Sequence, residues 1–222
     1  MQTNAFAAGE SMAIFPEAAR LNHACAGAFN AVYDWRENEG TLHVHALHNI
    51  RAGEELLTTY IDSKKPRAER QKYLKENYHF ECDCAVCTLP DEQSKESDRR
   101  LSTMANLYVK LKAWNEKTLT GSEAIAIVKK IWELGEEERY VSERGQLAAD
   151  AAIVATAHSD LDAASEWRAL AAKWFTRELG EDTPQVILNR KWTAEPDSHP
   201  IFGRRAEEKV GGPSESMKNS KL

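Results

Sequence analysis

Residues 53–87 read GEELLTTYIDSKKPRAERQKYLKENYHFECDCAVC, and the rest of the chain can be arranged around this stretch. A tyrosine, Tyr60, ends its first apolar segment. Three closely spaced cysteines end the stretch itself: Cys82, Cys84 and Cys87. The only other cysteine of the chain, Cys25, stands in the upstream fragment Asn22-His23-Ala24-Cys25. What joins these two segments is therefore the first question that the sequence raises.

The spacing of the cysteines favours a metal site. The pattern C-x-C-x-x-C is poor for disulfides among its own members, but it can wrap several thiolates around one ion. A closed structural zinc site needs four ligands. The chain has four cysteines in all, the three of this motif and Cys25, so every cysteine would be a ligand. The alternatives are free thiols or a redox pair, although a redox C-x-x-C motif usually opens a helix after a strand. We predict one structural Zn²⁺ bound by Cys25, Cys82, Cys84 and Cys87.

Charge and hydropathy exclude some classes of protein. The 29 basic and 35 acidic side chains leave a formal net charge of −6, which argues against a mainly electrostatic nucleic-acid binder. A mildly acidic protein suits a basic peptide partner, but most soluble proteins are mildly acidic too. The sequence has no long uncharged apolar run and no secretory signal after Met1. We therefore expect an intracellular protein, in the nucleus or the cytoplasm, without a membrane partner.

The first part of the chain reads as mixed strands and one helix. Residues 41–46, TLHVHA, alternate apolar and histidine side chains, which predicts a strand with one buried face. A second strand is expected at 56–60. Pro66 then opens a helix that continues from Arg67 to Glu76, and the cysteine-rich loop follows it.

The second part reads as helical. Residues 90–100, PDEQSKESDRR, have no large apolar side chain and are expected to be a linker. Apolar residues then recur at three- and four-residue steps through residues 101–180, where Ser122 is a plausible N-cap and alanine-rich helices follow. Paired helices of this kind look like tetratricopeptide hairpins, although no clean 34-residue repeat is present. Residues 181–222 are rich in proline and glycine and are expected to be largely irregular or disordered.

Some of these residues have simpler interpretations. A tyrosine at a strand end, such as Tyr60, is most often a core residue with its hydroxyl at the rim. Alternating strand histidines usually form a solvated face, so metal binding by His43, His45 and His48 is not expected.

Three segments in this order and spacing resemble a known family. NHAC (Asn22–Cys25), GEELLTTYID (Gly53–Asp62) and NYHFECDCAVC (Asn77–Cys87) are similar to the late SET motif, the tyrosine strand and the post-SET cysteine segment of SET-domain protein-lysine methyltransferases. The resemblance is best to the branch that includes MYND-finger enzymes and fungal SET-domain proteins. It implies an α+β chain: a partial β-rich SET fold with its post-SET zinc loop in residues 1–89, then the linker, the helical domain and the tail.

The resemblance also implies roles for individual residues. Tyr60 and Tyr78 would be catalytic, with Tyr60 placed where methyl donor and acceptor meet. Asn22, His23, Tyr60 and Phe80 would bind S-adenosylmethionine, with Phe80 stacked on the adenine. Phe6 and Tyr78 would line the channel for a lysine of a histone or another protein. The metal site of the family matches the four cysteines.

Two departures from the family pattern lead to an alternative function. The family motif usually continues to a proline-asparagine pair, whereas this chain reads Ala26-Gly27-Ala28, so a side-chain hydrogen-bonding knot near the tyrosine strand is expected to be absent. The glycine-containing strands that hold the methionine part of the donor have no counterpart before the first motif. We expect a protein-lysine N-methyltransferase; the alternative is a catalytically inactive, N-terminally truncated SET remnant that acts as a zinc-stabilised interaction module.

Overall fold

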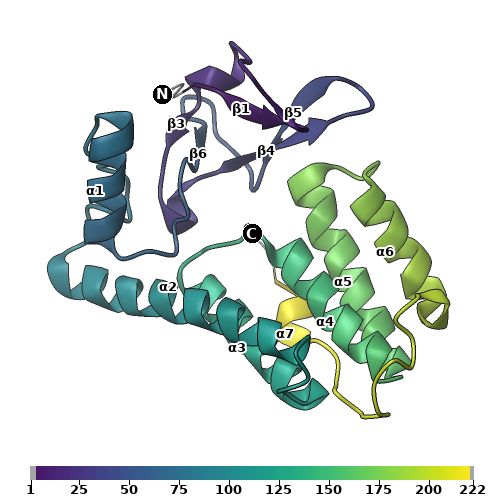
Figure 1. Ribbon diagram of the computed structural model, residues 1–222. Helices are drawn as coiled ribbons and strands as arrows, with labels where there is room; N and C mark the ends of the chain where they lie inside the picture. The colour runs from purple at the N-terminus through teal and green to yellow at the C-terminus, as the bar shows by residue number, and fades with distance from the viewer. Residues whose placement is uncertain (1–3, 221–222) are drawn as a thin grey trace. The chain divides into compact units, whose positions relative to one another are not determined.

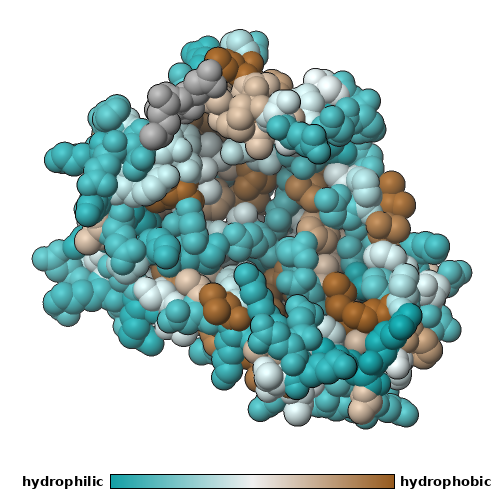
Figure 2. All heavy atoms as spheres, in the orientation of Figure 1, coloured by the Kyte–Doolittle hydropathy of each residue, from teal (hydrophilic) through white to brown (hydrophobic). Residues whose placement is uncertain are grey.

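The computed structural model describes residues 4–220 and shows an α+β chain (Figure 1). It divides into two compact units: residues 1–105 with 138–140, and residues 106–137 with 141–222. The strands and the cysteines belong to the first unit, and the second is helical. The face drawn in Figure 2 is mostly hydrophilic, with hydrophobic residues in small separate groups.

The strands of the first unit pair two by two within the described residues. Two pairs are antiparallel ribbons: β1 (Phe6–Ala8) with β2 (Ser11–Ala13), and β4 (Ala31–Arg36) with β5 (Thr41–Ala46). The third pair is parallel and joins β3 (Asn22–His23) to β6 (Leu57–Thr58). Asn22 lies opposite Leu57 and His23 opposite Thr58, so this short pair brings the Asn-His fragment beside the segment that leads to Tyr60.

Two strand predictions need correction. The strand at 41–46 is present, but its apolar side chains do not share a buried face, because Val44 is 43% exposed whereas His45 is half-buried. β5 forms a two-stranded ribbon with β4, in which Leu42 is half-buried and Ala46 is exposed like Val44. The strand predicted at 56–60 is shorter, and Tyr60 lies in a bend just after β6.

A hydrogen-bonding knot near the tyrosine segment is present, contrary to the prediction from Ala26-Gly27-Ala28. Asn30 supplies it from further along the chain. Its Oδ1 accepts from the Leu57 N–H at 2.8 Å, and its Nδ2 donates to the Glu55 carbonyl at 2.8 Å. The amide side chain therefore fixes the start of β6, and it does so five residues beyond Cys25.

Helix α1 (Arg67–Tyr78) confirms the predicted helix that begins after Pro66. It ends because His79 adopts a left-handed conformation with φ 63°, which turns the chain back toward the strands. The expected linker at 90–100 is helical instead, since α2 runs from Asp91 to Leu111. Its charges of mixed sign form ion pairs one turn apart, such as Lys95 with Glu92 at 2.7 Å, and such pairs stabilise a helix.

The second unit consists of the end of α2 and the helices α3 (Gly121–Glu137), α4 (Arg144–Ala157), α5 (Leu161–Leu179), α6 (Pro184–Ala194) and α7 (Glu215–Lys218). Its core contains the fully buried side chains of Trp132, Trp167 and Trp174. The N-cap of α3 is Thr120 and not Ser122, because Thr120 and Glu123 form a reciprocal capping box. Among the described residues, no helix combines the length and apolar character needed to cross a membrane.

The prediction that residues 181–222 are largely irregular or disordered is also wrong for the described residues. Residues 184–194 form α6, and the irregular segment beyond it is held by specific contacts. Glu208 accepts from the N–H groups of Gly121 and Ser122 at the start of α3, at 3.0 and 2.9 Å. Val210 and Met217 are buried. Proline and glycine thus shape an extended, packed segment here.

Candidate active site and metal centre

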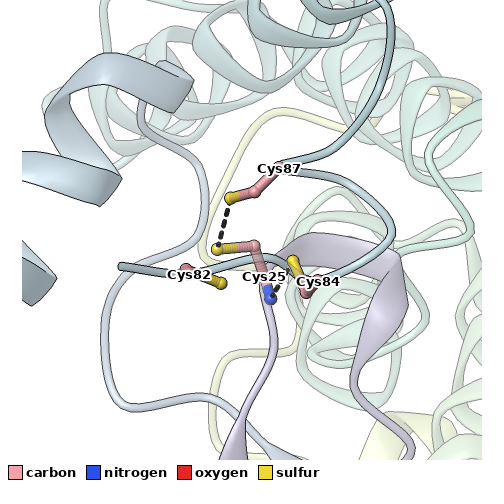
Figure 3. Close-up of side chains that lie close together, drawn as sticks. All are labelled: Cys25, Cys82, Cys84 and Cys87. Carbon is pink, nitrogen blue, oxygen red and sulfur yellow. Dashed lines mark hydrogen bonds between the residues drawn. The ribbon is translucent and has the colours of Figure 1, made fainter. Parts of the chain in front are cut away.

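The four cysteines converge, as the sequence predicted. Cys25 stands two residues after the end of β3, and the other three cysteines lie in the loop between α1 and α2 (Figure 3). Their Sγ atoms all lie within 4.8 Å of one another, and Cys25 Sγ is 3.7 Å from Cys87 Sγ. Sulfurs about 2.3 Å from a tetrahedral zinc ion would be about 3.8 Å apart. The cluster is therefore consistent with a closed zinc site.

Burial and electrostatics also suit a metal ligand set. Cys25 is fully buried, and Cys82 and Cys87 are 5% exposed. Hydrogen bonding with Cys25 lowers the pKa of Cys84 and that of Cys87, whereas hydrogen bonding to the other three thiols raises the pKa of Cys25. The thiolate is the metal-binding form of cysteine. The lowered pKa values of Cys84 and Cys87 therefore favour the form that binds a cation.

His23 connects the cysteine cluster to Tyr60. Its Nδ1 accepts from the Tyr60 backbone N–H at 3.0 Å. A neutral ring then carries its proton on Nε2, which lies 3.2 Å from Cys25 Sγ and can donate to it. Burial lowers the pKa of His23 to about 4, so the ring is neutral near pH 7. The side chain thereby links a predicted metal ligand to the backbone of the predicted catalytic tyrosine.

A pocket of about 620 Å³ lies beside this histidine. The sequence-predicted residues that line it are Asn22, His23, Tyr60, Tyr78 and Phe80. Its volume falls in the range of about 300–1,000 Å³ typical of small-molecule sites. Phe80 reaches the pocket because the left-handed His79 reverses the chain after α1, and its ring centroid is 6.1 Å from that of His23.

A smaller cavity of about 70 Å³ shares Tyr60 and Tyr78 with the pocket. Phe6 and Tyr33 form part of its wall and pack edge to face, with ring centroids 4.9 Å apart. Phe6, for which the family resemblance implied a place in the lysine channel, thus lines the same small cavity as Tyr60 and Tyr78. The two tyrosines stand where a wide polar pocket meets a narrow aromatic one.

The tyrosines at this junction are held by backbone groups. The Tyr60 hydroxyl donates to the Leu21 carbonyl at 2.5 Å, and the Tyr78 hydroxyl donates to the Tyr60 carbonyl at 3.4 Å. Their rings are 5.1 Å apart. Burial raises the pKa of both phenols, so both keep their protons at neutral pH.

Sequence reasoning missed several residues that line these cavities. Glu55 is the most informative, since its Oε1 accepts from Asn22 Nδ2 at 2.6 Å and its carboxylate faces the larger pocket. The sequence signal that could have indicated Glu55 is its place in an acidic turn just before the tyrosine segment. Tyr33, which lines the smaller cavity, and Asn30, which holds the start of β6, come from a region without a recognised motif, and nothing near them in sequence indicated their partners.

The strand histidines His43 and His45 are half-buried and do not form the solvated face that was expected. His43 lies 2.9 Å from a carboxylate oxygen of Glu39, and its ring stacks near that of His45. Among the described residues, one group of three or more His, Cys, Asp or Glu side chains lies close enough together to hold a metal ion, and this group consists of the four cysteines.

Comparison with known proteins agrees with this geometry. Residues 2–61 match the SET domain family. Residues 2–61 are thus similar to SET domains, and the two homologues below are lysine methyltransferases. The chain is 29% identical over 189 residues to the histone-lysine N-methyltransferase set5 of Schizosaccharomyces pombe, an alignment that covers 82% of this chain and 56% of that protein. It is 39% identical over 92 residues to the human N-lysine methyltransferase SMYD2, covering 40% of this chain and 20% of that protein.

The chain thus spans only about half of set5 and a fifth of SMYD2 in these alignments.

Proposed function

We propose that this chain is part of a protein-lysine N-methyltransferase that uses S-adenosylmethionine and acts on a lysine of a histone or another protein. The observation that carries the proposal is the position of Tyr60 and Tyr78, which line both the 620 Å³ pocket and the 70 Å³ aromatic cavity. A methyl transfer needs its two substrates to meet in line, and these two cavities meet at the tyrosines.

The larger pocket suits the donor. When bound, S-adenosylmethionine supplies a methyl group attached to a positively charged sulfur. Phe80 offers an aromatic face for the adenine, and Asn22 and His23 line the same pocket. The carboxylate of Glu55 complements the positive charges of the donor and holds the Asn22 amide in place.

The smaller cavity suits the lysine side chain. Its aromatic walls disfavour the ammonium form, whose pKa is about 10.4 in water, and so favour release of the proton before attack. Because the Tyr60 proton goes to the Leu21 carbonyl, the Tyr60 oxygen presents lone pairs to an amine N–H. Such a hydrogen bond would turn the amine lone pair toward the larger pocket. Catalysis would then consist mainly of alignment.

The cysteine cluster would hold the structural Zn²⁺ of this enzyme. Four thiolates leave no open coordination position, so the metal would have no direct part in catalysis. Its role follows from the contacts of Cys25 and the cysteine loop: it would tie the Asn22-His23 segment to the loop that begins at Phe80, and so keep the two sides of the donor pocket together.

Donor binding tests the proposal. Calorimetry with S-adenosylmethionine should show measurable affinity, and incubation with histones and cytosolic proteins should show methyl transfer to lysine. Tyr60→Phe should keep the affinity and lose about 100-fold or more in turnover, because the aligning hydroxyl is gone. Tyr73→Phe is a matched control, since Tyr73 is 52% exposed and does not line either cavity. Folded, zinc-loaded protein that binds no donor would refute the enzyme and favour the zinc-stabilised interaction module.

A further inference from the structure

Arg70 is a buried cation, and the described residues supply partners for only part of its guanidinium group. Its side chain is 0% exposed. The Nη1 group donates to the Lys65 carbonyl and lies 3.4 Å from Oδ1 of Asp98. The Nε and Nη2 atoms are also buried, but neither has a hydrogen-bond partner within residues 4–220. Buried N–H groups of a charged side chain without acceptors are costly, so a feature of this kind calls for a ligand.

The helix that carries Arg70 lies against the cysteine cluster. Leu74, one turn further along α1, is fully buried in the cluster that contains Cys25, Cys82 and Cys87. On the same helix, Arg67 Nη1 donates to the Leu89 carbonyl at 2.9 Å and Gln71 Nε2 donates to the Cys82 carbonyl at 3.4 Å. Arg70 therefore occupies the face of α1 that is turned toward the sulfurs.

The electrostatics of Arg70 agree with this placement. Burial by itself lowers the pKa of its guanidinium group, but the neighbouring thiols of Cys25 and Cys87 and the carboxylate of Asp98 outweigh burial, and the pKa is raised. Asp98 is shared, because its Oδ1 also accepts from the Arg67 backbone N–H at 2.8 Å. One carboxylate that already caps a helix leaves room for a second anionic partner.

A tetrathiolate zinc site is such an anion. Four thiolates around Zn²⁺ carry a net charge of −2, and a buried dianion is costly unless cations or N–H donors stabilise it. Two of the N–H groups near the sulfurs are the Cys25 backbone N–H, 3.4 Å from Cys84 Sγ, and His23 Nε2, 3.2 Å from Cys25 Sγ. Both belong to uncharged groups, so neither reduces the net charge.

We propose that Arg70 is the charge partner of the zinc centre, with its Nε–H and Nη2–H groups donating to the thiolate sulfurs. Arg70 is then a positioning residue, which acts on the site through the metal ligands. The proposal rests on the zinc site proposed above. Groups that bond to metal ligands commonly change metal affinity by about 10- to 100-fold when they are removed. Lysine would keep the charge but cannot present the two adjacent planar N–H groups of arginine.

The test compares Arg70→Gln and Arg70→Lys with Arg67→Gln in the full chain. Arg67→Gln is a matched control, since it removes hydrogen bonds from α1 to the carbonyls of the same loop but leaves Arg70 in place. Zinc dissociation constants come from competition with a chelating dye, and Co²⁺ replaces zinc for spectroscopy. We expect Arg70→Gln to weaken zinc binding by about 10- to 100-fold, Arg70→Lys to lie between it and the wild type, and Arg67→Gln to stay near the wild type.

The cobalt spectrum separates a charge partner from a merely structural residue. Removing N–H donors from the sulfurs should shift the thiolate-to-cobalt charge-transfer band in Arg70→Gln and leave it unmoved in Arg67→Gln. If Arg70→Gln does not fold, Asp98→Asn decides, because loss of the competing carboxylate should shift the band in the opposite direction. An unshifted band together with zinc affinity within twofold of the wild type, or an unshifted band in Asp98→Asn, would overturn the inference. Wild-type protein without zinc would refute the metal site itself.

Discussion

Replacing Cys25 with serine tests whether one metal ion joins the two parts of the site. Cys25 and Cys84 are 59 positions apart in the sequence, and a shared zinc ion would close the chain between them into a loop. Treated as a covalent cross-link of that length, the closure reduces the entropy of the unfolded chain by an amount worth about 4 kcal/mol at 25 °C. Folded domains have only about 5–15 kcal/mol of stability, so losing this link should be easy to measure.

The assay combines metal content with unfolding by urea. Wild-type protein should contain about one zinc per chain, and a strong chelator should lower its free energy of unfolding by about 4 kcal/mol. Cys25→Ser should contain little zinc, should be destabilised to the same degree, and should no longer respond to the chelator. Cys84→Ser should behave in the same way. Ala85→Ser is the control, because it places a serine at an exposed position between Cys84 and Cys87 and should retain the metal.

One result would refute the reasoning about the site. If Cys25→Ser retained one zinc per chain and the full response to the chelator, Cys25 would not be a ligand. The Asn22-His23 segment and the cysteine loop would then lack their common link, and the donor pocket would need another explanation.

Three further predictions concern the pocket, a close backbone contact and the helical unit. Phe80→Ala should weaken S-adenosylmethionine binding by about 10-fold in calorimetry, because the adenine loses its aromatic face. Phe202→Ala, at a residue that is 41% exposed, should leave the affinity unchanged. Equal affinities of Phe80→Ala and the wild type would exclude stacking on Phe80. Gly27→Ala should lower the free energy of unfolding by about 1–3 kcal/mol, since its Cβ would lie 2.1 Å from the Glu138 carbonyl oxygen; an unchanged urea midpoint would contradict this contact. Burial raises the pKa of Glu178 from 4.5 to about 7, so the folded state takes up a proton, and the stability from this group is complete below about pH 4.5 and is lost as the pH rises through 7. By pH 8 that loss is about 3 kcal/mol. Urea midpoints should therefore show Glu178→Gln to be more stable than the wild type at pH 8, by up to this amount, but not at pH 4.5. A stability difference between the two proteins that does not change with pH would be evidence against the raised pKa of Glu178.

Local sequence predicted the elements whose formation depends on neighbouring residues. Helix α1 follows from Pro66 and the helix formers after it, and the strand at 41–46 follows from alternation. The charged segment at 90–100 was misjudged because its side chains pair with one another along α2, so it needs no apolar face to be helical. The tail was misjudged because its anchors, such as Glu208 at the start of α3, are partners from distant sequence.

The sequence by itself determined the inventory of the site: one tyrosine after an acidic turn, four cysteines, and an aromatic residue next to the cysteine loop. Only the tertiary structure decided their arrangement. It showed that His23 bridges Cys25 and Tyr60 and that Asn30 holds the start of β6. It also showed that the guanidinium of Arg70 is buried, with two nitrogen atoms that find no partner in the described part of the chain. The physical reason is that these contacts join residues far apart in the chain, where spacing and periodicity carry no information about which groups meet.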